Sequence, residues 1–582
     1  NYEVCDSEWS KMNISNLSIG TLKYLAKQDN SREYNKIMKE EMNRFINDST
    51  DIGGSHNDIA RALFSKYGSE IICGSITNKV WYYYNKNKWT RTEEGTYLRT
   101  KISTEVVKIL NHNIKQIRKE MKNLDHREDS DDSEDEDTEV DVKANRRRHI
   151  ENIKEKQQLE KKIDKLYKLQ GNCKTAPYKN NIMREAMEIF YNPDFLTSLD
   201  NNPNIIAFKN GVYDLKTNMF RSGLPEDYVS IQMGVNYESF EPDSPLIKDI
   251  DDLLLKVFPD KSIRKYFLDI SSDTFVGGNH SKLVAVWSGE GDNAKSVMQS
   301  LFEQMFGKYS VKLPTSLIVG KRTQSSSACP ELARAGNGVR WAVLQEPDKK
   351  DVINSGILKE LSGNDTFYAR GLYKEGGDMT PMFKLTLICN DTPQLSSSDK
   401  AVWNRIRVIP FESTFTDDAP ETFEQQLREK RFPIDRNFAE KIPSLITAFA
   451  YYLLEYRKKN MNKRRTEPRK VKIATAAYQK RNDILRQFIE ETIVEDEGKS
   501  ISMSEVYSEF KEWFKHNMPN QTIPVSNEVK EYLIKKWGEC KGSKKVSKWK
   551  NYRLRTIQDD IDDGEAIVLD NEDLNDNYIP NL

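Results

Sequence analysis

A short loop rich in small and polar residues carries the side chains best suited to phosphate chemistry. It reads GEGDNAKS from Gly289 to Ser296 and follows an apolar run, Leu283 to Trp287. Backbone N–H groups of such a loop, together with the N-terminus of a following helix, can surround a polyphosphate. Lys295 would reach the outer phosphates, and the Ser296 hydroxyl would bind Mg²⁺. The pattern predicts nucleotide binding by the whole loop: Gly289, Glu290, Gly291, Asp292, Asn293, Ala294, Lys295 and Ser296.

The residues on either side of the loop favour a strand before it and a helix after it. The helix would end at Gly307 and place on one face Val297, Leu301, Phe302 and Met305. Ala294 departs from the pattern G-x-x-x-x-G-K-[ST], in which a second glycine is usual. Alanine suits this position if its φ is negative, and Gly289 and Gly291 still supply flexibility. A chance match is the alternative, and the motifs that follow argue against it.

Two further buried-strand patterns end in polar residues of the kind that ATPases use. Arg340 to Leu344 (RWAVL) leads into Gln345 and Glu346, and Phe383 to Cys389 (FKLTLIC) leads into Asn390. We expect Glu346 at the end of a strand adjacent to the phosphate-loop strand, where it would hold the Mg²⁺ shell and polarise the attacking water. Asn390 would contact the γ-phosphate or that water. A surface glutamate at a strand end is the alternative.

Two arginines in the segment WNRIRVIPF, from Trp403 to Phe411, could neutralise charge that develops on a phosphoryl group. When Arg405 or Arg407 is supplied by a neighbouring copy, hydrolysis depends on assembly. Taken alone, two arginines in a strand more often form ion pairs with local carboxylates.

Five segments together resemble the superfamily 3 helicases, in the poxvirus-type primase-helicase branch of large cytoplasmic DNA viruses. The segments are GEGDNAKS, RWAVLQEP, LKELSGNDTFYARGLY, LTLICND and DKAVWNRIRVIPFESTF, and the preceding NPNIIAFKNGVYDL resembles the domain that accompanies this ATPase. The resemblance implies a ring-forming, typically hexameric AAA+ ATPase that uses ATP and Mg²⁺. It further implies 3′ to 5′ movement on single-stranded and forked DNA during viral DNA replication, in the host cytoplasm.

The resemblance also assigns roles to single residues. It implies a phosphate-loop role for Lys295 and Ser296, the second motif for Glu346, the sensor for Asn390, and the arginine finger for Arg405, with Arg407 as the second candidate. Gln345 stands where many related ATPases have a metal-associated Asp, which leaves Ser296 and water to dominate the Mg²⁺ shell. That departure keeps open an alternative, a nucleotide-gated DNA clamp or loading scaffold that hydrolyses ATP without unwinding. Phosphoryl transfer to a small molecule is disfavoured by the sensor and the paired arginines.

A glycine-containing basic turn between the second motif and the sensor matches the hairpin that grips DNA in similar helicases. By that match Arg370 and Lys374 are the expected DNA contacts, with Lys359 as a further candidate, because a cation on such a hairpin can hold a phosphate by charge. An ordinary solvent-exposed hairpin is the alternative.

The fold class we expect is α/β, with an AAA+ core, an α+β N-terminal accessory domain, and a mainly helical, winged-helix-like C-terminal domain. Length alone suggests several domains. The expected units are an accessory domain at 1–240 with an acidic disordered insertion at about 125–148, the ATPase at 241–420, a helical lid and basic linker at 421–475, a DNA-binding module at 476–556, and an acidic disordered tail at 557–582.

The regions outside the ATPase carry their own signals. Trp81 and Trp89 flank a polar turn and predict a hairpin whose aromatics either stack on bases or, as we favour, pack in a core. Ten of the fourteen residues in 128–141 are acidic. Helical patterns span 246–275, 442–456, 484–494, 502–514 and 526–537. Between Lys530 and Arg555 ten Lys or Arg face two acids, which favours contact with the DNA backbone, although a solubilising surface is an equal alternative.

Composition limits the setting in which the protein works. The net charge of −1 sums segregated acidic and basic blocks, which points to a charged partner. Six cysteines without a CxxC pair fit a reducing compartment and no structural zinc. No apolar run suits a membrane span, so we expect a soluble intracellular protein without a membrane partner. Because the chain begins at Asn1, we expect a fragment that a primase domain precedes.

Overall fold

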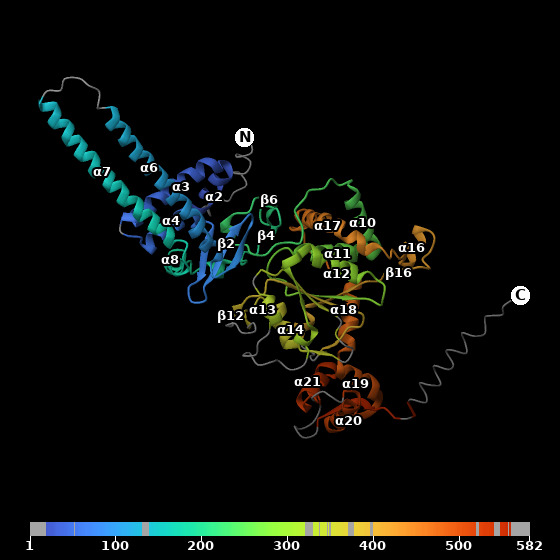
Figure 1. Cartoon of the computed structure of the whole chain (residues 1–582). Helices are drawn as coiled ribbons and strands as arrows, with labels where there is room; N and C mark the ends of the chain where they lie inside the picture. Colours follow the sequence, from blue (N-terminus) through green and yellow to red (C-terminus); the bar gives the residue numbers. More distant parts are fainter. Residues whose placement is uncertain are drawn as a thin grey trace.

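The computed structural model describes residues 19–51, 53–130, 139–319, 330–336, 338–345, 347, 351–369, 377–395, 400–518, 523–540, 547–556 and 558–559. A mixed α/β core occupies the middle of the molecule (Figure 1). A long helical hairpin projects from one end, and a small unit of helices and two strands lies at the other.

The core is built on a five-stranded sheet in which every pair of neighbouring strands is parallel. Its order is β15-β7-β13-β9-β8. The strands are β7 (Val284–Ser288), β8 (Ser310–Leu313), β9 (Trp341–Gln345), β13 (Lys384–Cys389) and β15 (Ile406–Pro410). All six residues of β13 are buried, which is typical of a parallel sheet covered on both faces. The expectation that the strand before Glu346 adjoins the phosphate-loop strand is wrong, because β13 lies between β7 and β9.

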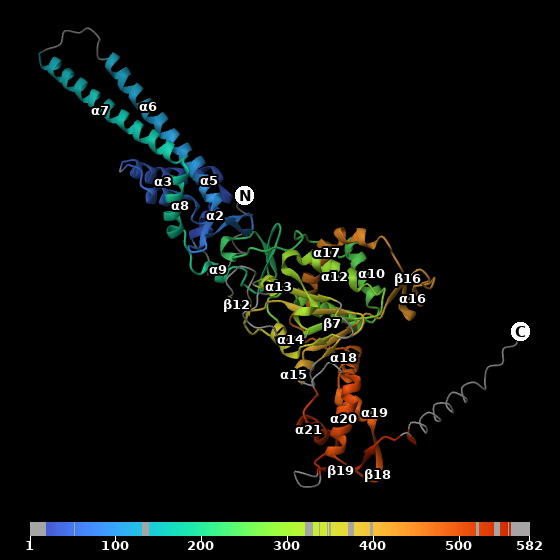
Figure 2. The ribbon, with the colours of Figure 1, turned by 60° about the horizontal axis from the view of Figure 1, so that its bottom comes forward.

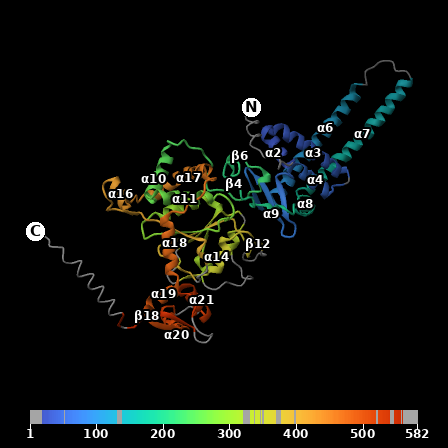
Figure 3. The same ribbon diagram turned by 180° about the vertical axis from the view of Figure 1, so that it is seen from behind.

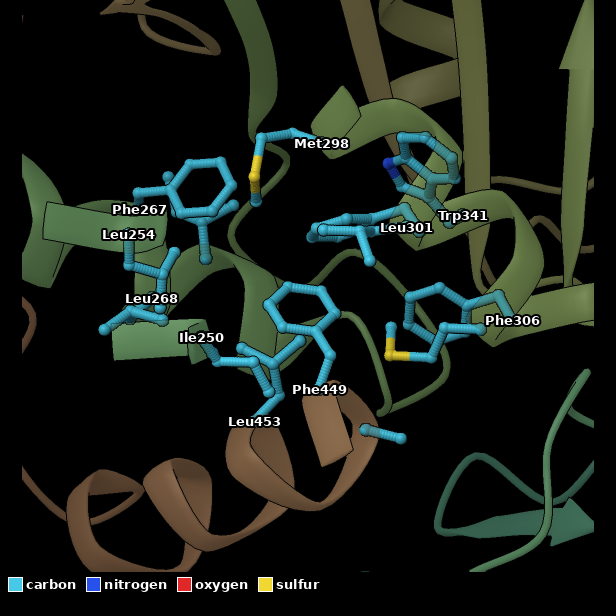
Figure 4. Packing of buried hydrophobic residues seen from close by; sticks show 14 of the residues in the cluster. Ile250, Leu254, Phe267, Leu268, Met298, Leu301, Phe306, Trp341, Phe449 and Leu453 are labelled. Atoms are coloured by element: carbon cyan, nitrogen blue, oxygen red, sulfur yellow. The ribbon is translucent and has the colours of Figure 1, made fainter. Parts of the chain in front are cut away.

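Helices cover one face of this sheet around an aromatic core (Figure 4). They are α10 (Pro245–Val257), α11 (Lys261–Asp273), α12 (Lys295–Phe306) and α17 (Phe438–Asn460). Phe302 of α12 packs against Trp341 with ring centroids 5.1 Å apart, and against Phe449 of α17 at 5.7 Å. The amphipathic helix predicted over 442–456 is therefore confirmed and packs on the core. The helical stretch predicted over 246–275 is two helices, because Pro259 lies between α10 and α11.

Shorter elements complete the core and cover its other face, where α14 (Ser355–Ser362) and α18 (Arg469–Arg481) contribute buried residues. The remaining helices are α13 (Pro330–Arg334), α15 (Lys400–Trp403) and α16 (Phe423–Glu429), with short helical turns at Gly307–Tyr309 and Thr315–Leu317. Two-stranded pairs are formed by β10 (Val352–Ile353) with β14 (Gln394–Leu395), β11 (Phe367–Ala369) with β12 (Gly377–Met379), and β16 (Thr414–Thr416) with β17 (Arg431–Pro433).

The N-terminal part has its own buried cluster. It contains α2 (Ile19–Asp29), α3 (Ser31–Asp51), α4 (His56–Tyr67), β1 (Ile71–Ser75), β2 (Val80–Asn85), β3 (Lys88–Glu93), α5 (Thr96–Lys101), a π-helical turn (Ile102–Val106), α8 (Ala176–Ile189) and α9 (Phe195–Ser198). The predicted aromatic hairpin is formed by β2 and β3. Trp81 and Trp89 are each 1% exposed, so core packing, and not base stacking, is their role.

The projecting hairpin consists of α6 (Val107–Ser130) and α7 (Glu139–Asn172) (Figure 2). Disorder predicted across 125–148 is wrong at both ends of that range, because α6 continues to Ser130 and α7 begins at Glu139. Residues 131–138 lie outside the described part. Long charged helices gain from side-chain pairs three and four residues apart, a contribution that acidic composition alone does not reveal.

A small antiparallel sheet joins the N-terminal part to the core. It contains β4 (Ile205–Phe208), β5 (Gly211–Asp214) and β6 (Met219–Arg221), followed by a helical turn at Pro225–Asp227. Arg340, which precedes β9 and is 1% exposed, donates to the carbonyls of Asn202 at 2.9 Å and Ile205 at 3.2 Å. These buried hydrogen bonds fix the segment before β4 to the edge of the central sheet.

The C-terminal unit confirms the three predicted helices and adds a sheet (Figure 3). It contains α19 (Ile484–Thr492), β18 (Ile493–Ser502), α20 (Met503–Asn517), α21 (Ser526–Trp537) and β19 (Lys548–Leu554), with β18 and β19 antiparallel. Ser502 and Glu505 form a capping box at the start of α20.

Membrane-spanning helices, metal-binding clusters and cysteines are considered for the described residues only. No helix there has the length and apolarity to cross a bilayer. No cluster of three or more His, Cys, Asp or Glu able to hold a metal occurs in that part of the chain, and the four cysteines described in it are free.

Candidate nucleotide-binding site

The phosphate loop lies where three parallel strands end together. Ser288, the last residue of β7, is in register with Cys389 of β13 and with Pro410 of β15. The loop that begins at Gly289 therefore lies beside Asn390. Gly289 must be glycine, because a Cβ there would approach the side-chain nitrogen of Asn293 to 2.2 Å and the carbonyl of Phe411 to 2.6 Å. The carboxyl edge of a parallel sheet is the usual place for a ligand in α/β folds.

The side chain of Lys295 folds back over the phosphate loop. Its Nζ donates to the carbonyl of Gly289 at 2.6 Å and to Oδ1 of Asn293 at 2.9 Å, and the residue is 6% exposed. It opens α12, whose first turn carries no side-chain cap, so its N–H groups remain available to phosphate oxygens. Ser296, the next residue, is exposed at this helix end. The loop, Lys295 and Ser296 thus lie together at one end of the sheet, and their chemistry would suit a nucleoside triphosphate with Mg²⁺.

Ala294 adopts a backbone conformation that the sequence analysis did not expect. Its φ is 61° and its ψ is 14°, in the left-handed region, so the condition under which alanine would suit this position, a negative φ, is not met. The backbone keeps the shape that a glycine would adopt more easily, because the loop must turn into α12. Asp292, at φ 54°, is also left-handed. The loop therefore holds strain at the position where the general pattern has glycine.

We expect Ala294→Gly to stabilise the core by about 0.5–1 kcal/mol, since relief of left-handed strain outweighs the greater freedom of glycine in the unfolded chain. Ala294→Val should destabilise it, because a branched Cβ fits that region poorly. Thermal unfolding followed by calorimetry compares the three proteins. If Ala294→Gly lost as much stability as Ala294→Val, the interpretation that Ala294 is strained would be contradicted.

The second motif is only partly described. Gln345, the last residue of β9, donates from Nε2 to Oε1 of Gln299 at 2.6 Å, and Gln299 donates in turn to Glu303 at 2.7 Å. The sequence analysis missed Gln299. Its spacing of four residues from Lys295 on the same helix was the available signal. A neutral amide pair thus stands where many related ATPases hold a metal-associated acid. Glu346 lies outside the described residues, and its role stays a prediction.

Asn390 is exposed directly after β13, one strand from the phosphate loop, and its sensor role stays a prediction. The preceding Cys389 is buried beneath the loop. Burial raises the pKa of its thiol to about 12, against a smaller opposing effect of Lys295. The thiol is therefore neutral and adds no negative charge beside the phosphates.

Arg405 and Arg407 lie at the opposite edge of the sheet from the phosphate loop. Arg405 immediately precedes β15, and its carbonyl accepts from the N–H of Val284 at the start of β7. Its Nη1 donates to the carbonyl of Ala401 at 2.7 Å, and its Nε is buried without an acceptor among the described residues. Arg407 instead pairs with Glu467 at 3.0 Å. The local ion pair considered for both arginines is formed by Arg407 within the described part.

Of the three predicted DNA contacts, only Lys359 lies among the residues that the structure describes. Arg370 and Lys374 lie outside the described residues, between β11 and β12, which pair antiparallel from Phe367 opposite Met379 to Ala369 opposite Gly377. The strands on either side thus form the expected hairpin. Lys359 is half-buried in the last turn of α14 and is not part of these two strands.

The fold and the site together define a mixed α/β protein whose parallel sheet carries a phosphate loop at the carboxyl end of an inner strand. Residues 60–259 match the family described as D5 N terminal like. The chain is 31% identical to a candidate helicase of frog virus 3 over 95% of its own length and 63% of that protein. It is also 31% identical to a candidate helicase of Acanthamoeba polyphaga mimivirus, over 91% of this chain and 53% of the relative.

From its motifs, we expect the chain to be most similar to the African swine fever virus protein. This expectation is wrong. A candidate primase of that virus is 24% identical over 62% of this chain and 38% of its own length, so the frog virus and mimivirus proteins are more similar. Among solved structures, the apo NrS-1 C-terminal region is similar with a TM-score of 0.32 and 13% identity, covering 58% of this chain and 70% of that one. The chain spans about half to two-thirds of the length of the viral relatives that are 31% identical to it.

Proposed function

We propose that this protein is an ATP-driven DNA helicase that works as a ring of identical subunits in viral DNA replication. The observation that carries the proposal is the placement of the phosphate loop and Arg405 at opposite edges of one parallel sheet. A subunit built in this way offers nucleotide on one side and an arginine without a carboxylate partner, among the described residues, on the other. Similarity to candidate viral helicases over most of the chain supports the unwinding activity.

Each step of ATP hydrolysis has an assigned group in this proposal. The loop N–H groups and Lys295 bind and orient the phosphates, while Asn390 contacts the γ-phosphate or the attacking water, which Glu346 would polarise. Mg²⁺, held by Ser296 and by water in the shell around Glu346, would neutralise charge on the phosphate oxygens. Arg405 of the adjoining copy would stabilise the charge that develops in the transition state. The Gln345 and Gln299 pair adds no charge, so the metal would depend on Ser296 and Glu346.

DNA would be held by two parts of the chain. The hairpin of β11 and β12 would present Arg370 and Lys374 to a single strand. The C-terminal unit, in which three helices accompany the antiparallel pair of β18 and β19, has the element order of a winged helix. Its exposed cations on α21 and β19 would contact the phosphate backbone: Lys535, Lys536, Lys548 and Lys550. The unit boundaries we propose are those expected from the sequence, with the ATPase at 241–420 and the DNA-binding module at 476–556.

Strand separation on two duplexes, one with a 3′ and one with a 5′ single-stranded tail, tests the proposal. With ATP and Mg²⁺ the protein should release the labelled strand of a duplex that has a single-stranded 3′ tail, and a 5′-tailed duplex should stay paired, since movement is expected 3′ to 5′. ATP hydrolysis measured in the same samples supplies the control. A protein that binds these duplexes and hydrolyses ATP but leaves both of them paired would be the clamp or loading scaffold, the function that the neutral Gln345 pair favours.

A further inference from the structure

A cavity of about 530 Å³ opens at the amino edge of the central sheet, away from the phosphate loop. It lies beside Leu283, which precedes β7, and Lys384, which begins β13. Helix α11, the end of α17 and the basic linker after α17 form its other walls. We call it the basic cavity, because five cations line it with three carboxylates: Lys384, Arg407, Arg457, Lys463 and Arg465, with Asp269, Asp273 and Glu467. The five cations exceed the three carboxylates by two charges.

Two of the three carboxylates already have partners. They therefore neutralise little of the remaining positive charge in the cavity. Glu467 pairs with Arg407 at 3.0 Å. Asp269 pairs with Lys265 at 2.8 Å and accepts from the Tyr456 hydroxyl at 2.8 Å. The remaining carboxylate, Asp273, pairs with Arg465 at 3.3 Å and attracts both Lys384 and Arg457. One carboxylate thus serves three cations.

Lys384 is the most unusual of these cations. It is 7% exposed, and its ammonium donates to the carbonyl of Val276 without an ion pair to any carboxylate in the described part of the chain. Burial is the largest cause that lowers its pKa, to about 8. Three cations face it and act in the same direction, namely Arg340 before β9, Arg457 on α17 and Arg465 after α17, while Asp273 on α11 opposes them. A lysine ammonium in this setting has donors and charge that the fold leaves unmatched.

Arg457 is similarly short of acceptors. Its Nη1 contacts the sulfur of Met461 at 3.5 Å, and its Nε is buried without any acceptor among the residues that the structure describes. A buried guanidinium nitrogen without a partner is uncommon, because it loses its hydration and gains nothing in return. Planar guanidinium groups match the oxygens of a phosphate especially well.

We propose that the basic cavity is a second phosphate-binding site that takes the terminal phosphates of a small phosphorylated ligand, of the nucleoside polyphosphate or pyrophosphate class. A terminal phosphate carries close to two negative charges at neutral pH, which the excess of cations in the cavity can neutralise, whereas a carboxylate carries one. The size of the cavity suits a ligand of this class. The site is separate from the phosphate loop, since β7 runs between them. Exposed His280 and Lys463 lie at its opening to solvent.

Binding of inorganic pyrophosphate to the Lys295→Ala variant tests the site, because the phosphate loop of every copy is then disabled. We expect calorimetry to show one remaining site per chain. Lys384→Met and Arg457→Gln should each weaken that site by about tenfold or more, through loss of a charge-assisted contact. The matched control is Lys458→Gln, the next residue of α17, which is exposed and pairs with Glu455 at 3.9 Å outside the cavity. It should bind as its parent does.

The outcomes separate this site from the proposed helicase activity. Loss of all pyrophosphate binding in Lys295→Ala, or unchanged affinity in both cavity variants, would overturn the second site and leave the helicase proposal standing. ADP in a parallel titration identifies a nucleotide as the source of the phosphates if it competes with pyrophosphate. A short single-stranded oligonucleotide is the third probe, and its binding in place of pyrophosphate would assign the cavity to DNA and overturn the proposal.

Proton uptake gives a second measurement that a purely structural role of Lys384 would not change. Near pH 8 the free lysine is partly neutral, and a bound anion raises its pKa, so binding should take up protons from solution. Calorimetry in buffers of different ionisation enthalpy measures this uptake. It should disappear in Lys384→Met and persist in Lys458→Gln, and binding without uptake in the Lys295→Ala parent would contradict the role of Lys384.

Discussion

Lys295→Ala is expected to lose ATP hydrolysis by on the order of 10³-fold, with or without DNA, because it removes the cation that faces the outer phosphates. In the structure the ammonium is held by the carbonyl of Gly289 and by Asn293, two neutral acceptors within the loop. Phosphate oxygens are stronger acceptors for an ammonium than these groups. The lysine is therefore placed to move from loop to ligand without rearrangement of α12.

Phosphate release measured under steady-state conditions gives the size of the effect. Lys308→Ala is the matched control, since Lys308 is an exposed cation just beyond the other end of α12. It should hydrolyse ATP as the unmodified protein does. Circular dichroism establishes that the Lys295 variant keeps its secondary structure. Near-normal turnover in a folded Lys295→Ala protein would remove the phosphate loop from the mechanism.

The local parts of this site could be predicted from sequence because short-range physics determines them. The apolar run before the loop and the helical spacing after it predicted β7 and α12 to within a residue at their loop ends, and Gly307 ends the helix at φ 54°. Asn390 was placed correctly because a strand end can be recognised from its own residues. Each of these signals lies within about a dozen residues of the feature that it predicts.

The order of strands and the backbone at Ala294 could not be predicted in this way. Sequence order suggested that β9 adjoins β7, but β13 lies between them after a long crossover. Which strands pair depends on packing across the whole sheet, and no residue in β9 or β13 encodes it alone. Ala294 shows the same limit in one residue. Its side chain favours negative φ, and the junction between loop and helix overrides that preference.

The boundary between α19 and β18 in the C-terminal unit also depends on a residue far away in the sequence. The helix predicted to reach Val494 ends at Thr492, because Ile493 pairs with Leu554 near the other end of this unit. A helical pattern that continues by one or two residues cannot compete with a sheet hydrogen bond of this kind. The capping box at Ser502, in contrast, involves residues three apart and was recognised directly.

Arg405→Ala is expected to bind ATP normally and to lose hydrolysis by on the order of 10³- to 10⁵-fold, the range found for arginine fingers. The geometry separates Arg405 from the phosphate loop of its own copy. Arg405 lies five strand residues from the level of Ser288, a separation of about 16 Å along the sheet. An arginine side chain cannot span that distance to its own loop. In the proposed ring, the transition-state charge that Arg405 neutralises is presented by a neighbouring subunit.

A mixture of two inactive variants tests this directly. Lys295→Ala retains Arg405, and Arg405→Ala retains the phosphate loop, so a mixed assembly contains some interfaces with both groups intact and should regain hydrolysis. Arg407→Ala is the comparison variant, and its loss should be smaller, because Arg407 already pairs with Glu467. Either an inactive mixture or normal turnover by Arg405→Ala alone would exclude a shared site. Recovery in the mixture requires that one copy complete the site of the next, since neither variant contains both groups.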